Sequence, residues 1–219
     1  CLAQLIKPGT PIVYGLGGSP TEMKTGSYVN GSPEDAKHTA IVTAMGRYYN
    51  IPCRSQGALT ESFGLDYQAG MESAMMLTTA ALSGVHLSLH ACGTYGSMIA
   101  MSYEKFIADE DLCGALKKLI KPLEFTDDAY AMDLIKELGT SGDYLLQMHT
   151  VNRCRDEFFR PDLSSQKMHS EWFEMKPRDI TQRAGKLLEK RLTEYVKPEI
   201  DPHLEKDLVR YVKKRKHNI

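Results

Sequence analysis

Residues 52–70 read PCRSQGALTESFGLDYQAG, which predicts a short strand, a polar loop and the start of an Ala/Met/Leu-rich helix. The next strand is predicted at 85–90, and it runs into the small-residue turn HACG at 90–93. A strand, a helix and a strand in succession predict parallel pairing, with both polar loops at one edge. Since ligands bind at the carboxyl ends of such strands, the stretch indicates an α/β enzyme.

The same alternation extends to both sides of this stretch. A strand is predicted at 11–14, helices are predicted at 32–49, 66–82, from 102, at 111–120 and at 126–138, and a further strand at 142–150. The first helix is expected to carry one face made of Ala36, Ala40, Ile41, Ala44, Met45 and Tyr48.

About four strand–helix units are counted, whereas a closed (β/α)8 barrel needs eight units and about 250 residues. The chain of 219 residues is therefore either an open sheet or about half of a barrel. The fold class is α/β, and the domains are expected at 1–178, a partial barrel, and at 179–219, an extension of two charged amphipathic helices.

Composition narrows the classes of function. Lys+Arg 27 against Asp+Glu 28 gives a net charge of -1, so no global basic field favours nucleic acid. The sequence shows no signal peptide and no apolar run of membrane-spanning length. Five scattered cysteines are typical of reduced thiols in the cytoplasm. Signatures of zinc sites and P-loops are missing from the sequence, so no metal site is expected.

The polar loop after residue 53 holds the first candidates, Arg54, Gln56, Thr60 and Glu61. Turn and cap chemistry could account for Thr60, but it does not explain Gln56 or Arg54. A mostly apolar pocket fixes its ligand with a few placed polar groups, so we favour a ligand site here.

Other candidates follow the later strands. His90 ends the strand at 85–90, with a histidine bonded only to backbone groups as the alternative. His149 has the same placement after 142–148, and Arg155 could hold a carboxylate through two hydrogen bonds. Tyr95 is among the aromatic side chains that could face a cation, although simple packing is commoner.

A series of motifs, in order and at similar spacing, resembles the C-terminal half of the trimethylamine methyltransferase family. It comprises Gly57-Ala-Leu-Thr-Glu61, Asp66-Tyr-Gln68-Ala-Gly70, Gly84, His90-Ala-Cys-Gly93, Ser102-Tyr-Glu104, Asp109, His149-Thr150, Arg155 and Phe158. The resemblance implies a (β/α)8 barrel and methyl transfer from a small methylated amine to cob(I)alamin. It also implies that the corrinoid is carried by a separate cognate protein and is not bound permanently by this chain.

The trimethylamine enzymes of this family use pyrrolysine, which the resemblance places at or next to Ala58. An ordinary alanine there implies a relative that acts on quaternary amines such as glycine betaine, with trimethylamine as the other candidate. A quaternary nitrogen already leaves as a neutral amine, so the protein's task is mainly positioning. The resemblance implies His90, Gln56 and Glu61 as catalytic residues and Arg54, Ala58, Thr60, Tyr95, His149 and Arg155 as substrate-binding residues.

Two other functions remain open from the sequence. A barrel lyase or aldolase could use Glu61 and His90 as acid and base. A non-catalytic fragment could instead dock a corrinoid protein through the C-terminal helices. A half-barrel exposes sheet edges and lacks half its pocket, so it is expected to be inactive unless its other half is supplied. A homo-oligomer is also compatible with the sequence.

Overall fold

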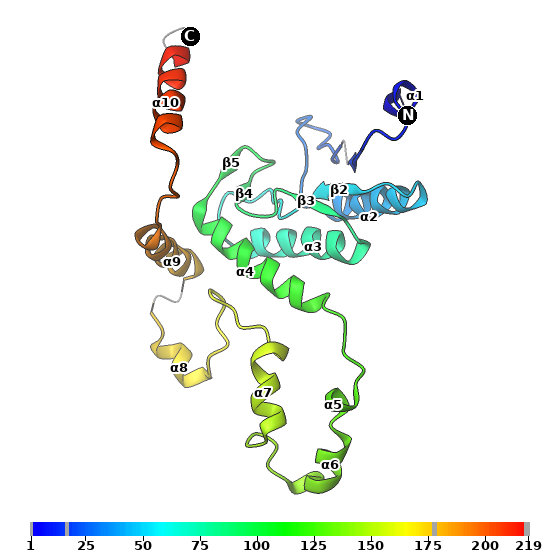
Figure 1. The fold of residues 1–219 in the computed structure, drawn as a ribbon, viewed down its shortest axis with the longest axis vertical. Helices are drawn as coiled ribbons and strands as arrows, with labels where there is room; N and C mark the ends of the chain where they lie inside the picture. The colour runs from blue at the N-terminus through cyan, green and yellow to red at the C-terminus, as the bar shows by residue number, and fades with distance from the viewer. Residues whose placement is uncertain (1, 16–17, 177–178, 217–219) are drawn as a thin grey trace. The chain divides into compact units, whose positions relative to one another are not determined.

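The computed structural model describes residues 2–15, 18–176 and 179–216 (Figure 1). By contacts the chain divides into two compact units, Cys1–Leu188 and Glu189–Ile219. It is a mixed α/β protein in which helices outnumber short strands among the described residues. None of the described helices is long and apolar enough to cross a membrane.

The first unit is built on a parallel sheet of three strands in the order β1-β2-β3. These strands are β1 (Tyr14–Gly15), β2 (Cys53–Gln56) and β3 (Leu87–Leu89). Gln56 lies opposite Leu89 in the register, so the loops that follow β2 and β3 leave the sheet at the same edge. The predicted strand–helix–strand unit at 52–90 is therefore confirmed.

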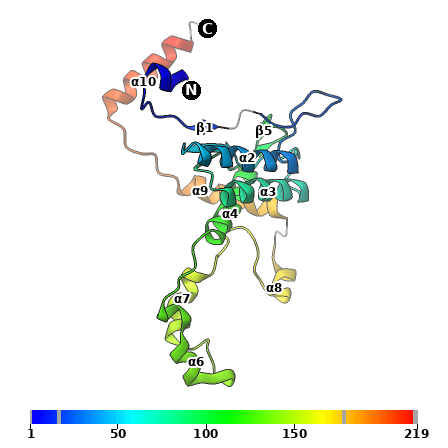
Figure 2. The same ribbon diagram turned by 90° about the vertical axis from the view of Figure 1, so that its right-hand side faces the viewer.

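The two crossovers are α2 (Pro33–Tyr48) and α3 (Tyr67–Ser83), which pack side by side (Figures 1 and 2). Each helix begins at a residue whose side chain accepts a hydrogen bond from a free backbone N–H. Ser32 accepts from Asp35 N at the start of α2, and Asp66 accepts from Ala69 N at the start of α3. Gly84 ends α3 in the left-handed conformation at φ 80°. These boundaries agree with the cap signals in the sequence.

The apolar face named from the sequence is mostly not the buried face of α2: Ala36 is buried and Ala40 is half-buried, and the other four residues are exposed. Ile41 is 61% exposed and Tyr48 is 79% exposed, while Thr39 and Thr43 are fully buried. Small side chains face the interior because the helix lies close to the sheet: a Cβ on Gly46 would lie 2.9 Å from Cys53 Cβ. Thr43 can be buried because its hydroxyl donates to the Thr39 carbonyl at 2.8 Å. Side-chain size therefore decided this face, and hydrophobicity did not.

The two helices predicted from 102 and at 111–120 form one helix, α4 (Tyr103–Leu119), which packs against α3. A hairpin of β4 (Thr94–Tyr95) and β5 (Ala100–Met101) precedes it, and the sequence did not predict this hairpin.

The segment predicted as one helix at 126–138 is divided into α5 (Asp127–Tyr130) and α6 (Met132–Leu138). The division falls at Ala131, whose φ is 49°.

The strand predicted at 142–150 is also wrong. The segment is a turn that leads into α7 (Met148–Glu157). The Asp143 carboxylate accepts from Leu145 N at 3.0 Å, and the Asp143 carbonyl accepts from Gln147 Nε2 at 3.0 Å. Local side-chain bonds of this kind compete with the pairing that a strand needs. The described residues thus hold three parallel strands, where about four units were expected, and the barrel remains a prediction.

The remaining elements are short or lie toward the termini. They are α1 (Leu2–Ile6), η1 (Gly139–Ser141), α8 (His169–Glu174), α9 (Ile180–Glu194) and α10 (Pro202–Lys216). The last two confirm the pair of C-terminal helices expected from the sequence. The boundary between the compact units falls inside α9, and the domain boundary expected between residues 178 and 179 stays a prediction.

Two apolar clusters form the core of the first unit. One joins Ala58, Leu77 and Leu116, which come from the loop after β2, from α3 and from α4. The other joins Ile107, Leu163 and Ala184. The first cluster includes Ala58, which belongs to the loop that carries the predicted site. Packing in the core therefore controls the shape of that loop.

Candidate active site

Gln56 and His90 meet at the carboxyl edge of the sheet. Gln56 is the last residue of β2, His90 follows β3 directly, and His90 Nδ1 lies 3.3 Å from Gln56 Oε1. Because an amide oxygen can only accept, Nδ1 carries the hydrogen in this pair. His90 has a φ of 51°, which is uncommon for a residue with a side chain and is found often at functional sites. The structure thus brings two predicted catalytic residues together.

The two loops behind this pair approach each other backbone to backbone. A Cβ on Gly57 would lie 2.6 Å from Ala91 Cα and 2.7 Å from the Leu89 carbonyl oxygen. These separations leave no room for a side chain. Glycine at position 57 is therefore the local reason that the loop after β2 can lie beside the turn after β3.

Glu61 ties three loops together. Its Oε1 accepts from Asn30 N at 2.7 Å and from Ser97 Oγ at 2.5 Å. The same Ser97 hydroxyl lies 2.6 Å from the carbonyl oxygen of Tyr28. These contacts give Glu61 a structural task, and its predicted catalytic role stays a prediction.

Thr60 is buried, and its side chain forms a hydrogen bond to a residue of α3. Its hydroxyl donates to Glu72 Oε2 at 2.6 Å, and the same oxygen accepts from Glu61 N at 2.9 Å. Glu72 lies on α3, so its carboxylate fastens the polar loop to the helix that follows. A substrate-binding role for Thr60 also stays a prediction.

Ala58 and Tyr95 lie in the interior. The Ala58 side chain is fully buried and packs in the cluster with Leu77 and Leu116. Tyr95 is 6% exposed, and Lys105 Nζ lies 5.7 Å from the centre of its ring. Burial, with a further contribution from the Asp109 charge, raises the pKa of Tyr95 to about 12. In this structure the cation beside the Tyr95 ring is an internal lysine.

Arg54 lies within β2 and is partly buried. Its side chain covers β1, because a Cβ on Gly15 would lie 2.7 Å from Arg54 Nε. The guanidinium thus lies over the neighbouring strand, near the edge where Gln56 ends β2.

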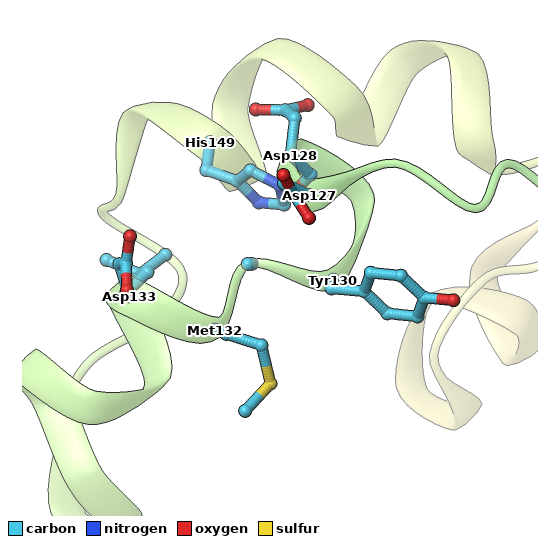
Figure 3. Close-up of a pocket in the computed structure, with 8 residues that line it drawn as sticks. Asp127, Asp128, Tyr130, Met132, Asp133 and His149 are labelled. Carbon is cyan, nitrogen blue, oxygen red and sulfur yellow. The ribbon is translucent and has the colours of Figure 1, made fainter.

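His149 lies on α7 and lines a different cavity. Its Nε2 lies 2.7 Å from the Asp128 carbonyl oxygen, and it faces a cavity of about 560 Å³ lined otherwise by residues of the segment 127–134 (Figure 3). Sequence analysis expected His149 beside Gln56 and His90. Because 142–150 does not form a strand, His149 does not join the edge of the sheet. Its contacts are with α5.

Arg155 is exposed on the same helix. The neighbouring Arg153 makes the ion pairs of this region, at 2.6 Å to Glu124 and at 2.5 Å to Asp128. Both predicted residues of α7 therefore lie in a region tied to α5, and their substrate-binding roles stay predictions.

Two thiols lie next to the candidate site. Cys92 is two residues after His90, and Cys113 on α4 lies with its Sγ 3.9 Å from the Ala91 carbonyl oxygen. A hydrogen bond from Cys92 lowers the pKa of Cys113 to about 7, and the same bond and burial raise the pKa of Cys92. Scattered cysteines in the sequence did not indicate this pair.

Sequence analysis assigned no role to the charged residues that hold the loops, Glu72, Lys105 and Asp109, although Asp109 is one of the motif residues. Lys105 and Asp109 are four residues apart on one helix, a spacing typical of ion pairs. That signal was available, but the sequence does not say that the pair is buried. For Glu72 there was no signal, because its partners Thr60 and Glu61 reach it only through the fold.

Across the described ranges, no three His, Cys, Asp or Glu side chains are grouped so that they could hold a metal ion. The Gln56–His90 pair instead offers an amide and an imidazole beside a turn of small residues, Ala91 to Gly93. Such a surface can hold a polar substrate group.

Fold and site together define a class: an α/β protein with a parallel sheet and polar side chains gathered at the carboxyl edge of its strands. The family model for trimethylamine methyltransferase matches residues 1–219, so the chain belongs to this family.

Several curated relatives are similar to the chain. The glycine betaine methyltransferase of Desulfitobacterium hafniense (strain Y51) is 38% identical over 98% of this chain and 44% of its own length. The L-carnitine:corrinoid methyltransferase of Eubacterium limosum is 34% identical over 90% of this chain and 41% of its own. The trimethylamine methyltransferase MttB of Desulfitobacterium hafniense (strain DSM 10664 / DCB-2) is 30% identical over 84% of this chain and 36% of its own length. The chain thus spans less than half the length of these relatives.

Proposed function

We propose that the chain is part of an enzyme that moves a methyl group from a quaternary amine, such as glycine betaine, to the cob(I)alamin of a corrinoid protein. Family membership and the similarity to methyltransferases named for glycine betaine and L-carnitine support this proposal. The observation that carries it in the structure is the contact between Gln56 and His90 at the sheet edge.

Gln56 and His90 suit the polar part of a betaine. A quaternary nitrogen neither donates nor accepts hydrogen bonds, so hydrogen-bonded recognition must come from the rest of the molecule. With Oε1 accepting from His90 Nδ1, the Gln56 amide nitrogen keeps two N–H groups that can donate to a carboxylate. The pair would hold the substrate in one orientation, which is the main requirement of a transfer between two bound partners.

The surroundings of Ala58 support a quaternary substrate over trimethylamine. Ala58 and Leu59 are both fully buried, and position 57 has no room for a Cβ. A long side chain at any of these three positions would enter the core or collide with the turn after β3. These three positions therefore have no room for an adduct-forming residue such as pyrrolysine.

Cob(I)alamin, presented by the separate corrinoid protein, supplies the nucleophile for methyl transfer. The part of this chain is to bind and orient the amine and to keep the turn beside His90 free of large side chains. Roles in substrate binding for Arg54, Tyr95, His149 and Arg155 belong to this proposal as predictions.

The test is a methyl-transfer assay with reduced cobalamin, in which the absorbance of the cobalt centre is followed. The chain is assayed alone and together with the N-terminal portion of the Desulfitobacterium glycine betaine relative, with glycine betaine, L-carnitine and trimethylamine as substrates. We expect turnover with a quaternary amine only when both portions are present. A Gln56→Leu variant is expected to lose most of this turnover, whereas Gln166→Leu, far along the chain, is the matched control.

Transfer from trimethylamine and from neither quaternary amine would overturn the proposed substrate class. Turnover by the chain without a corrinoid, with a bell-shaped pH profile that depends on Glu61, would favour the lyase or aldolase alternative. Binding to a corrinoid protein without any turnover in the presence of both portions would favour a docking role.

A further inference from the structure

A buried ion pair lies beneath the candidate site. Lys105 and Asp109 face each other on α4, with Nζ 2.5 Å from Oδ2, and their side chains are 0% and 5% exposed. Charged side chains are rarely buried so completely, because their removal from water costs several kcal/mol, as an order of magnitude, for each ion. Such a pair needs a reason in the structure.

Both charged groups form hydrogen bonds to residues outside α4. Lys105 Nζ donates to the Ala58 carbonyl at 3.1 Å and to Ser73 Oγ at 2.9 Å, in addition to Asp109. These three bonds use all three hydrogens of the ammonium group. Asp109 Oδ2 in turn accepts from Gly93 N at 2.8 Å. The pair thus joins the loop after β2, helix α3 and the turn after β3.

The two loop residues that the ion pair binds, Ala58 and Gly93, lie close to the candidate site residues in the chain. Ala58 comes two residues after Gln56, and Gly93 comes three residues after His90. Gly93 has a φ of 85°, so the turn that binds Asp109 has a conformation that suits glycine. A change in the separation of Ala58 from Gly93 would therefore change the separation of Gln56 from His90.

We propose that Lys105 and Asp109 are positioning residues, which set the distance between the two loops that carry Gln56 and His90. Stability alone does not explain the pair, because replacing a buried ion pair with apolar residues of similar volume is often neutral or stabilising. An apolar pair would, however, leave the Ala58 carbonyl and the Gly93 N–H without these partners. The inference rests on the proposed function only where it concerns the amine.

The test compares two double variants of the chain. Lys105→Met/Asp109→Leu removes the buried pair and keeps its volume. Lys190→Met/Glu194→Leu makes the corresponding replacements in an exposed ion pair of α9 with the same i,i+4 spacing and a separation of 3.9 Å, and serves as the control. Melting temperature, hydrogen exchange of the Gly93 amide and the NMR signals of the His90 ring are measured in each, together with glycine betaine binding.

For the buried pair we expect a loss of Gly93 protection of roughly tenfold or more, beyond any change in overall stability, and displaced His90 signals. Betaine binding should weaken in the same variant. The control should match the parent in all four measurements. If the pair had a packing role alone, the His90 signals and the Gly93 protection would change only as much as the overall stability changes.

A folded Lys105→Met/Asp109→Leu variant with the parent's Gly93 exchange and His90 signals would overturn the inference. If that variant does not fold, hydrogen exchange in the parent protein still tests the inference. Its Gly93 amide must exchange as slowly as the buried amides of α4, and exchange at the rate of an exposed turn would overturn the inference. Failure of the parent to bind glycine betaine in the presence of the N-terminal portion would count against the proposed function, and the loop measurements would still judge the positioning role.

Discussion

Gly57→Ala should destabilise the protein and separate the two catalytic candidates. The added Cβ would lie 2.6 Å from Ala91 Cα, 2.7 Å from the Leu89 carbonyl oxygen and 2.8 Å from Ala91 N. All three are backbone atoms, so no side-chain rotation can relieve the contacts. Because carbon atoms in contact normally lie about 3.5–4.0 Å apart, the two loops must move apart by roughly 1 Å.

The size of the effect follows from two opposing terms. Overpacking of this kind costs about 1–3 kcal/mol, whereas the smaller entropy of the unfolded alanine chain returns about 0.4–1 kcal/mol. A net loss of about 1–2 kcal/mol is therefore expected. Gly70→Ala is the matched control, because Gly70 lies inside α3 with no atom within 4 Å of the added Cβ. That variant should gain about 0.5–1 kcal/mol from helix propensity.

Urea unfolding, followed by circular dichroism, measures both variants, and the difference in their midpoints gives the comparison. The opposite signs expected for the same chemical change make the test specific to the contact between the loops. NMR signals of the His90 ring should move in Gly57→Ala and stay in place in Gly70→Ala. If Gly57→Ala is as stable as Gly70→Ala, the close approach of the two loops is wrong, and with it the geometry of the site.

Three further predictions concern titration and the polar loop. Since burial raises the pKa of Tyr95 from 10.0 to about 12, the folded state keeps this proton while unfolded chains lose it, so stability should fall by up to about 2 kcal/mol between pH 10 and 12. Tyr95→Phe should remove that part of the decline in alkaline unfolding curves, and an unchanged curve would contradict it. Alkylation of Cys113, followed by mass spectrometry, should have its midpoint near pH 7, and Cys92→Ala should move the midpoint upward; a midpoint near 9 in the parent would argue against the thiol pair. Glu72→Gln should cost about 1–3 kcal/mol in urea unfolding, because the carboxylate oxygen accepts from Thr60 and from the next backbone N–H, and a neutral result would show that these bonds are dispensable.

Prediction from sequence succeeded where the signal was local. The helices predicted to start at residues 32 and 66 do start there, with Ser32 and Asp66 as caps, because a cap depends on residues within one helical turn. It failed at 142–150, where a short strand or extended segment was predicted. That segment has its own turn bonds, and Asp143 is one of the residues that make them.

The buried face of α2 shows the other kind of failure. Ile41 and Tyr48 are hydrophobic and exposed, while Thr39 and Thr43 are polar and buried. Hydrophobicity predicts which face could be buried, but the distance to the neighbouring elements decides which side chains fit.

For the site, the sequence by itself determined the strand–helix–strand order and hence that Gln56 and His90 come at strand ends. The tertiary structure alone decided that these two side chains meet at 3.3 Å, that Ala58 is buried, and that His149 lies with α5. Caps and turns involve neighbours in the chain, so residue types are enough to predict them. Contacts such as that of Lys105 with Ala58 join residues 47 positions apart, and they exist only because the packing of helices on the sheet brings those positions together.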